Sequence, residues 1–337
     1  MKQEAVSMLE IAKHTNDVAR DQYGDAMASS VQYKTQFFLP MIERFLPSSA
    51  LDKNEVCQIL DLGSCTSSLA IDLAGHLPDN YHFIETDLDM NFLKKGRENV
   101  LQDPDLAGRF THIRANVVQI PLADASMDAV MHSSFFHEIF SFPVTEAGAF
   151  SKENCHQLIR EIRRVLKPGG YVLGRDYVSR PDNPDELLLL QADQTNGEVI
   201  EDLQDLLDAP VEKLSSYSLV KRFLYQFEPA QTGPIVVMED DKFTLPAWLA
   251  GELFFHTAYR KSSSMWDSEV YEMYGDSSAE DLEKMAQTFG FDPLLTESVS
   301  HYDIGENTGM VLSNTAGHII GTRQRFPTNT YIVWQKK

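Results

Sequence analysis

The pattern of hydrophobic positions between residues 56 and 180 alternates between two kinds of segment. Short apolar runs typical of buried strands are followed by stretches in which apolar residues recur at helical spacing. This alternation predicts βαβ units and a largely parallel sheet, and therefore an α/β fold. The expected strands are 57–62, 82–86, 111–114, 129–133 and 171–175, and the helical stretches between them include 68–75, 90–99 and 156–166.

The flanking segments follow other patterns. Residues 1–50 predict an N-terminal helical cap, because Phe37, Phe38 and Met41 recur at helical spacing. After the core at 51–180, residues 181–276 form an insertion, and residues 277–337 add a closing helix and the last two strands of the core. Within the insertion we expect helical stretches at 186–192 and 198–207, a hairpin across Asp240-Asp241 and an aromatic-rich helical region at 248–274.

Composition narrows the class of protein. The 337 residues include 50 Asp and Glu against 29 Lys and Arg, a net charge of −21. Such a surface repels phosphate backbones, so we expect no nucleic-acid partner, although the acidic balance also fits ordinary solubility. Cys57, Cys65 and Cys155 contain no C-x-x-C pair, and no histidine cluster has zinc spacing, which predicts a reducing compartment and no metal site.

The N-terminal residues and the apolar runs predict neither a signal peptide nor a membrane span. The first twenty residues have interspersed charges, which is typical of an amphipathic helix and not of a signal peptide. No run approaches the roughly 18 apolar residues that span a bilayer. We therefore expect a cytoplasmic protein without a membrane partner.

A strand–turn–helix segment carries the most specific chemistry. Residues 59–69 run from a strand into a turn of small residues around Gly63 and then into a helix. Small residues let the backbone approach a ligand, and a helix N-terminus offers N–H donors. The next strand ends at Asp87, 24 residues after Gly63, where a carboxylate can accept hydrogen bonds from a ribose. Asp87 could instead cap the helix that begins near Met90.

Four segments of the core carry motifs in order: Asp61-Leu62-Gly63, 85–89 with Phe92-Leu93, 120–122 with 125–130, and 164–170. With these segments in this order, residues 56–178 resemble a class I S-adenosylmethionine-dependent methyltransferase. The resemblance implies a Rossmann-like, mostly parallel seven-stranded sheet with helices on both faces.

The resemblance also implies S-adenosyl-L-methionine as cofactor. Gly63 would line its methionine part, Asp87 would hold the ribose, Leu88 would flank the adenine, and Asn116 with Val117 would face the adenine edge. The family commonly has glycine at the positions of Cys65 and Ser67 and an acid at that of Asn116. The full set of implied cofactor contacts is Asp61, Gly63, Ser64, Cys65, Asp87, Leu88, Asn116, Val117 and Ser133.

Candidate catalytic groups follow the fourth and fifth strands, whose carboxyl ends should adjoin the methyl group. A sulfonium methyl is already activated, so the protein mainly aligns the acceptor and removes its proton. His137 is the candidate base, and Glu138 or Asp176 would orient it or bind a cationic acceptor. His137 could instead cap the next helix or pack beneath the cofactor. Cys65 is read as a small packing residue and not as a nucleophile.

The insertion at 181–276 has two interpretations. Its aromatic residues, among them Trp248, Trp266 and Tyr271, are interleaved with Glu252, Glu269 and Glu272, which would suit an acceptor lid for a cationic or aromatic molecule. The same residues could form the insertion's own core with acids on its wet face.

The function that these observations favour is methyl transfer to a small-molecule acceptor, with a homodimer left open. Two alternatives stay open: a methyltransferase-fold binding protein that has lost catalysis, and an enzyme that uses the cofactor for another reaction. A nicotinamide dehydrogenase is disfavoured, because no G-x-G-x-x-G follows the first strand.

Overall fold

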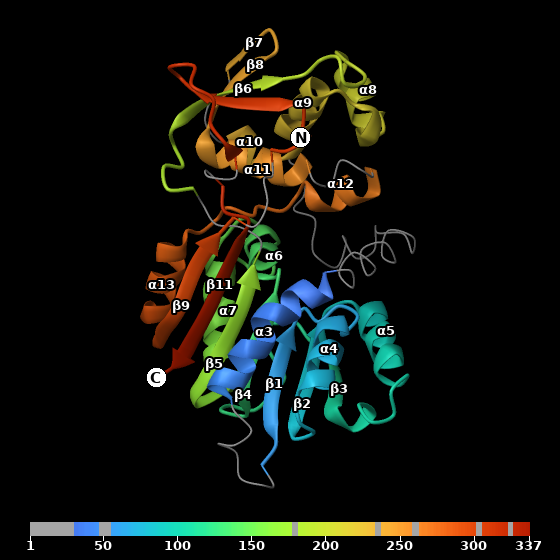
Figure 1. The fold of residues 1–337 in the computed structure, drawn as a ribbon, viewed down its shortest axis with the longest axis vertical. Helices are drawn as coiled ribbons and strands as arrows, with labels where there is room; N and C mark the ends of the chain where they lie inside the picture. Colours follow the sequence, from blue (N-terminus) through green and yellow to red (C-terminus); the bar gives the residue numbers. More distant parts are fainter. Residues whose placement is uncertain are drawn as a thin grey trace. The chain divides into compact units, whose positions relative to one another are not determined.

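The computed structural model describes residues 30–46, 55–176, 181–232, 237–257, 263–300, 305–322 and 326–337. The chain forms two compact units, each built from separate segments. Unit 1 comprises Met1–Asp176, Glu280–Glu297 and Tyr331–Lys337, and unit 2 comprises Tyr177–Ala279 and Ser298–Thr330. Figure 1 shows the elements of both units. Residues 298–330, expected in the closing part of the core, thus belong to unit 2.

Unit 1 contains a seven-stranded sheet in the order β3-β2-β1-β4-β5-β11-β9. The pairs from β3 through β5 are parallel, and Figure 1 shows β11 running opposite to β5. This confirms the expected Rossmann-like α/β fold. The strands are β1 (Cys57–Leu62), β2 (Tyr81–Asp87), β3 (Phe110–Arg114), β4 (Met127–Ser133), β5 (Leu166–Asp176), β9 (Phe291–Val299) and β11 (Asn329–Lys336).

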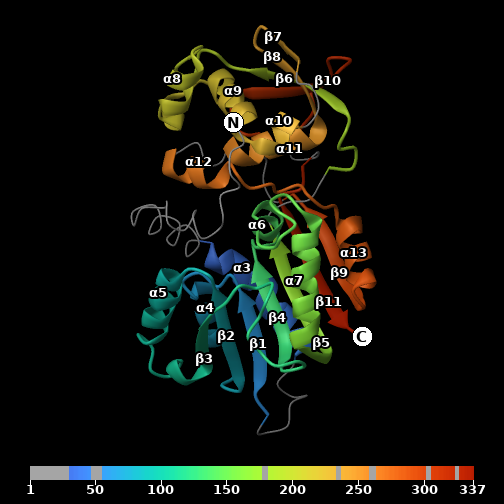
Figure 2. The same ribbon diagram turned by 180° about the vertical axis from the view of Figure 1, so that it is seen from behind.

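Helices cover both faces of this sheet. Phe38 and Ile42 of α3 and Leu73 of α4 are fully buried against Ile59 and Met131 of the strands, which forms one core layer. Figure 2 shows α7 and α13 on the opposite face from α3. The helices are α3 (Val31–Phe45), α4 (Ser68–His76), α5 (Met90–Val100), α6 (Phe136–Ser141), α7 (Lys152–Val165) and α13 (Ala279–Thr288), with a 3₁₀ turn η2 (Ala107–Arg109). The rest of the expected N-terminal cap, at 1–29 and 47–50, lies outside the described residues.

Local sequence determines where α7 ends and where β5 begins. Helix α7 begins after Ser151, whose hydroxyl accepts the Glu153 N–H at 3.3 Å. It ends at Val165, and β5 begins directly at Leu166, five residues earlier than expected. The Pro-Gly-Gly segment runs on as strand because Gly170 has no side chain: a Cβ there would lie 2.9 Å from the Asp128 carbonyl oxygen.

Unit 2 contains a four-stranded sheet in the order β10-β6-β8-β7, antiparallel throughout. The expected hairpin is confirmed as β7 and β8. The prediction of a helix at 186–192 is wrong, because these residues form the strand β6. Every second side chain of this strand, at Leu188, Leu190 and Ala192, is buried in the core of unit 2. Of the stretch 198–207, only its end is helical. The elements are β6 (Leu187–Ala192), α8 (Leu203–Asp208), η3 (Val211–Lys213), α9 (Ser216–Gln226), α10 (Glu228–Thr232), β7 (Val237–Glu239), β8 (Lys242–Pro246), α11 (Ala247–Thr257), α12 (Ser263–Glu269) and β10 (Met310–Asn314).

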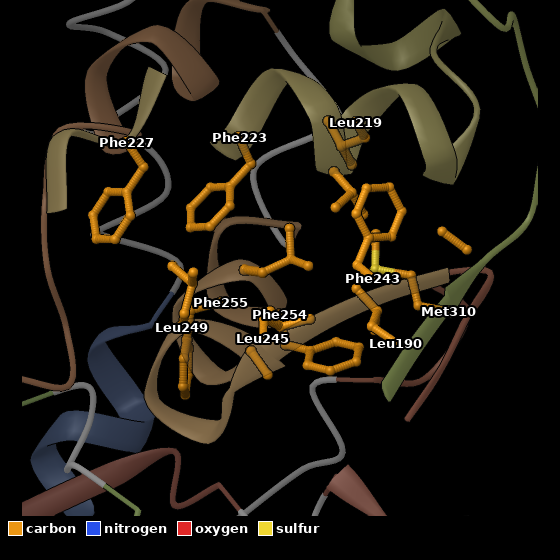
Figure 3. Packing of buried hydrophobic residues seen from close by; sticks show 14 of the residues in the cluster. Leu190, Leu219, Phe223, Phe227, Phe243, Leu245, Leu249, Phe254, Phe255 and Met310 are labelled. Atoms are coloured by element: carbon orange, nitrogen blue, oxygen red, sulfur yellow. The ribbon is translucent and has the colours of Figure 1, made fainter. Parts of the chain in front are cut away.

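Aromatic and aliphatic side chains fill the core of unit 2. Figure 3 shows Phe223 of α9, and Phe227 directly after that helix, facing Leu249 and Phe254 of α11. Trp266 is completely buried in the same core, where its indole Nε1–H donates to Gln226 Oε1 at 2.8 Å. The aromatic cluster therefore builds the unit's own hydrophobic core.

The acids of the insertion are also engaged within unit 2. The Glu252 carboxylate is buried and accepts the N–H groups of Tyr274 at 3.0 Å and Gly275 at 2.6 Å. The Tyr274 hydroxyl donates to the Glu269 carboxylate. These contacts hold the segment after α12 against α11. The acids do not form a wet face, as Glu252, Glu269 and Glu272 are all buried.

None of the described helices is both long and apolar enough to cross a bilayer.

Candidate functional site

The turn after β1 has the backbone that a close ligand approach requires. Gly63, Cys65 and Ser67 have φ angles of +66°, +49° and +60°, all in the left-handed region. Glycine adopts this region freely, whereas other residues incur strain of about 1 kcal/mol or more. Cys65 and Ser67 therefore keep the conformation for which the resembled family uses glycine.

Side-chain space explains how Ser67 is accommodated at this position. Ser67 is fully buried, and its Oγ lies 3.1 Å from His112 Nε2. The neighbouring helix α5 has Gly96 opposite, where a Cβ would lie 2.4 Å from the Ser67 Oγ. The Ser67 side chain therefore fits because the facing residue of α5, Gly96, has no side chain.

We expect Gly96→Ala to lower the free energy of unfolding by about 1–3 kcal/mol, because the added methyl group overpacks against Ser67. Ser67→Gly in the same protein should recover most of that loss, since it removes the atom that clashes. Urea unfolding of the two single variants and the double variant measures the coupling. Additive losses would show that the two positions do not contact.

Asp87, the candidate ribose ligand, closes this turn. Its Oδ2 accepts the Cys65 N–H at 3.0 Å and its Oδ1 accepts the Asp89 N–H at 2.8 Å. Burial raises the pKa of Asp87 to about 6. A carboxylate has about four lone-pair sites, so it can accept ribose hydroxyls as well. The N-cap of α5 is Asp89, whose Oδ1 accepts the Asn91 N–H at 2.7 Å, so Asp87 does not have that alternative role.

The candidate adenine contacts lie next to Asp87. The Ala115 N–H donates to the Asp87 carbonyl oxygen at 3.1 Å, which places the segment after β3 beside the end of β2. Val117 is buried, whereas Asn116 is exposed and its Oδ1 accepts the Val118 N–H at 3.2 Å. Leu88 is half-buried. An apolar side chain and an amide are thus available at the edge where the adenine is expected.

Two buried acids lie near the turn, one on β1 and one on the neighbouring strand β2. Asp61 of β1 and Glu85 of β2 are register partners, so their side chains lie on the same face of the sheet. Burial raises the pKa of Asp61 to about 8 and raises the pKa of Glu85 well above its ordinary value. The positive charge of Lys34 acts in the opposite direction on Asp61. Neither the burial of Glu85 nor the presence of Lys34 was foreseen from sequence.

Cys65 is suited to packing and not to nucleophilic chemistry. Burial, with the nearby Asp87 charge, raises the pKa of the Cys65 thiol to about 12. The reactive form of cysteine is the thiolate, which is negligible at neutral pH with such a pKa. The Ser64 N–H beside it donates to the Thr86 carbonyl oxygen at 3.0 Å and ties the turn to β2.

His137 and Asp176 form a hydrogen-bonded pair where β4 and β5 end. His137 Nδ1 lies 2.5 Å from Asp176 Oδ1, and both side chains are largely buried. A carboxylate only accepts, so Nδ1 donates and the neutral imidazole carries its lone pair on Nε2. Asp176 Oδ2 also accepts the N–H groups of Phe135 and Phe136 at 3.2 and 2.6 Å, which fixes the start of α6. Asp176 thus makes a hydrogen bond that orients His137.

Successive side chains at the end of β4 lie on opposite faces of the sheet. Ser133 and Arg175 are register partners, and the Ser134 N–H donates to the Arg175 carbonyl oxygen at 2.7 Å. On the other face, His132 packs against the Phe136 ring, and burial lowers the pKa of His132 to about 4. His132 is therefore neutral at pH 7, and sequence reasoning did not single it out.

The carboxyl edge of the sheet fits S-adenosylmethionine. The Ser133 hydroxyl oxygen is buried and has no hydrogen-bond partner within the part of the chain that the structure describes. A buried polar group of this kind usually has a partner, which a bound polar ligand would supply. The left-handed turn at Gly63 and the acceptor sites of Asp87 lie along the same edge. A ligand with a nucleoside at one end and a polar group at the other matches these positions.

Comparison with known proteins agrees with this geometry. Residues 60–174 match the family model of a methyltransferase domain. The ubiquinone/menaquinone biosynthesis C-methyltransferase UbiE of Vibrio campbellii is 27% identical over 124 residues, 37% of this chain and 42% of that protein. The demethylmenaquinone methyltransferase of Porphyromonas gingivalis is 30% identical over 141 residues, 42% of this chain and 48% of that protein. The chain spans about half the length of these curated relatives.

A solved structure of an S-adenosylmethionine-dependent methyltransferase from Methanosarcina mazei is 14% identical, covers 88% of this chain and 97% of its own, and gives a TM-score of 0.44. The similarity to methyltransferases rests on the matched domain and on the residues of the β1 turn, β2 and the segment before β5. Residues 60–174 therefore match a methyltransferase domain, and this part of the chain is similar to class I S-adenosylmethionine-dependent methyltransferases.

Proposed function

We propose that the protein transfers a methyl group from S-adenosylmethionine to a small-molecule acceptor, with His137 as the general base. The observation that carries this proposal is the 2.5 Å contact between His137 Nδ1 and Asp176 Oδ1 at the end of β5. This contact leaves the basic nitrogen, Nε2, on the side of the ring away from the carboxylate. The carboxyl ends of β4 and β5 adjoin the place where a class I methyltransferase presents its methyl group.

The residues of the site have separate roles in the proposed reaction. When bound, the cofactor supplies an activated methyl group on a sulfonium. Asp87 would hold the ribose of the cofactor, and the backbone around Gly63 would line its methionine part. His137 Nε2 accepts the proton that the acceptor atom loses as it becomes nucleophilic. The Asp176 carboxylate then stabilises the imidazolium, as an ion pair with Nδ1–H.

Unit 2 is proposed to recognise the acceptor. The chain passes from unit 1 into unit 2 directly after Asp176, the residue that orients His137. Since Trp266 and Glu252 are engaged in the core, the partly buried Trp248 and Tyr271 are the better candidates for acceptor contacts. An acceptor that is a small molecule also agrees with the names of the quinone-related relatives.

The test is transfer of a deuterated methyl group from labelled S-adenosylmethionine to the protein-free small-molecule fraction of a bacterial extract, followed by mass spectrometry. Demethylmenaquinone, named for the Porphyromonas gingivalis relative, serves as one defined acceptor. We expect the label in one small molecule, and none with heat-denatured protein. Label found instead in added protein or RNA would refute the small-molecule acceptor.

A further inference from the structure

The Ser67 hydroxyl does not have the role that serine usually has at the start of a helix. Ser67 is the N-cap residue of α4, a position where a serine side chain ordinarily accepts an N–H of the first helical turn. Within the described residues 55–176, its side chain makes no such capping hydrogen bond. The Ser67 Oγ lies instead 3.1 Å from His112 Nε2 of β3, and a hydrogen bond joins the two side chains.

This hydrogen bond accompanies an unusual backbone conformation at Ser67. A capping serine normally has β-region dihedral angles, whereas Ser67 has a φ of +60° and a ψ of 12°, in the left-handed region. In this conformation the Ser67 N–H donates to the Ser64 carbonyl oxygen at 2.9 Å, which closes the turn that presents the Cys65 N–H to Asp87. A serine that capped α4 in the ordinary way would therefore change the shape of residues 63–67.

Two neighbouring elements hold the turn in place. On α5, the Asn99 Nδ2–H donates to the Thr66 carbonyl oxygen at 3.2 Å. On β3, His112 is the register partner of Glu85 of β2, so the sheet fixes the position of its backbone. The turn is thus attached to α5 through a backbone carbonyl group and to β3 through the fully buried side chain of Ser67.

We propose that His112 is a positioning residue for the cofactor, because its hydrogen bond to Ser67 keeps residues 63–67 in the left-handed form that faces Asp87. This inference rests on the proposed function, since it takes S-adenosylmethionine as the ligand. Glycine would adopt the left-handed region freely and would need no such hydrogen bond. In this chain the imidazole stabilises a conformation that serine otherwise disfavours.

Loss of the imidazole should act on the turn through Ser67. The buried hydroxyl would then have no partner, and the ordinary capping conformation would become populated, because it gives the hydroxyl an N–H donor. The apparent affinity for a ligand falls with the fraction of the protein that is competent to bind. His112 thus influences cofactor binding without contacting the cofactor.

The experiment is a double-mutant cycle measured as affinity for S-adenosylhomocysteine by isothermal titration calorimetry. His112→Phe keeps a ring next to Phe110 but removes the hydrogen bond, and we expect the affinity to fall about 3- to 10-fold. Ser67→Gly should stay within about twofold of the wild type, because glycine adopts the turn freely. Adding His112→Phe to Ser67→Gly should cause no further loss, which shows that His112 acts through Ser67.

His82 offers a matched control on the neighbouring strand. Its Nε2 lies 2.9 Å from the Thr111 Oγ1, it is half-buried like His112, and burial lowers the pKa of both imidazoles, so both are neutral at pH 7. His82→Phe removes the same kind of hydrogen bond and should leave the affinity unchanged. His112→Gln has an amide that can bond to Ser67 and should recover most of the affinity.

Hydrogen–deuterium exchange measures the turn in the absence of ligand. Peptides that cover residues 60–70 should exchange faster in His112→Phe than in the wild type or in His82→Phe. Equal exchange in all three proteins would contradict a role of His112 in holding the turn.

Three affinity results would overturn the inference alone, given wild-type binding: no loss in His112→Phe, an equal loss in His82→Phe, or a loss that persists in the Ser67→Gly background. A wild-type protein that does not bind S-adenosylhomocysteine would overturn the proposed function and the inference together.

Discussion

His137→Gln should lower kcat for methyl transfer by roughly 10²–10⁴-fold, the usual contribution of a positioned general base. Glutamine keeps a hydrogen-bonding group near Asp176 but has no basic nitrogen. The affinity for S-adenosylhomocysteine should stay near wild type, because His137 is assigned to the acceptor's proton and not to the cofactor. Initial rates with the acceptor found by deuterated methyl transfer, together with calorimetry on the same preparation, measure both quantities.

Asp176→Asn is the matched control for the orientation of His137. The asparagine oxygen can still accept the N–H groups at the start of α6, so the local fold should persist, but the neutral amide does not stabilise an imidazolium. We expect a loss of kcat smaller than that of His137→Gln. Wild-type turnover in His137→Gln would show that this imidazole only caps or packs against α6.

Trp266→Ala should lower the free energy of unfolding by about 3–5 kcal/mol, because a completely buried Trp is removed from the core of unit 2 and its indole hydrogen bond is lost. Urea denaturation followed by circular dichroism measures the change. Tyr225→Ala, an exposed aromatic in the same unit, should cost less than about 1 kcal/mol. A loss for Trp266→Ala as small as that of the control would contradict the core assignment and favour an acceptor contact.

The fold of unit 1 could be predicted because its central strands are buried on both faces. Such strands read as continuous apolar runs, as in residues 57–62, which the structure reproduces without change as β1. The hydrophobic pattern of unit 2 predicted its helices and strands less well. The run Leu187–Leu190 contains four leucines, which favour helices, and only its pairing with β8 and β10 makes it a strand. The strand β10 was missed altogether, because its five residues lie in a segment without clear alternation.

Some residues near the candidate site could be proposed from sequence, whereas others depend on tertiary packing. Asp87 and His137 could be proposed as site residues from sequence because each stands close to the end of an expected strand. Lys34 could not, because a single lysine in an amphipathic helix is normally exposed and only the packing of α3 against α4 and the sheet buries it. The pairing of Ser67 with Gly96 also depends on tertiary contact, and no local pattern predicts it.

The proposed function requires that the chain binds S-adenosylmethionine through Asp87. Isothermal titration calorimetry of S-adenosylhomocysteine with wild type and Asp87→Ala tests this most directly. We expect measurable binding to the wild type and a loss of about 2–4 kcal/mol in Asp87→Ala, because two hydrogen bonds to a charged acceptor are removed. Asp87→Asn, which keeps an acceptor oxygen, should lie between them. Unchanged affinity in a folded Asp87→Ala protein would contradict the assigned site, and no binding to the wild type would contradict cofactor use itself.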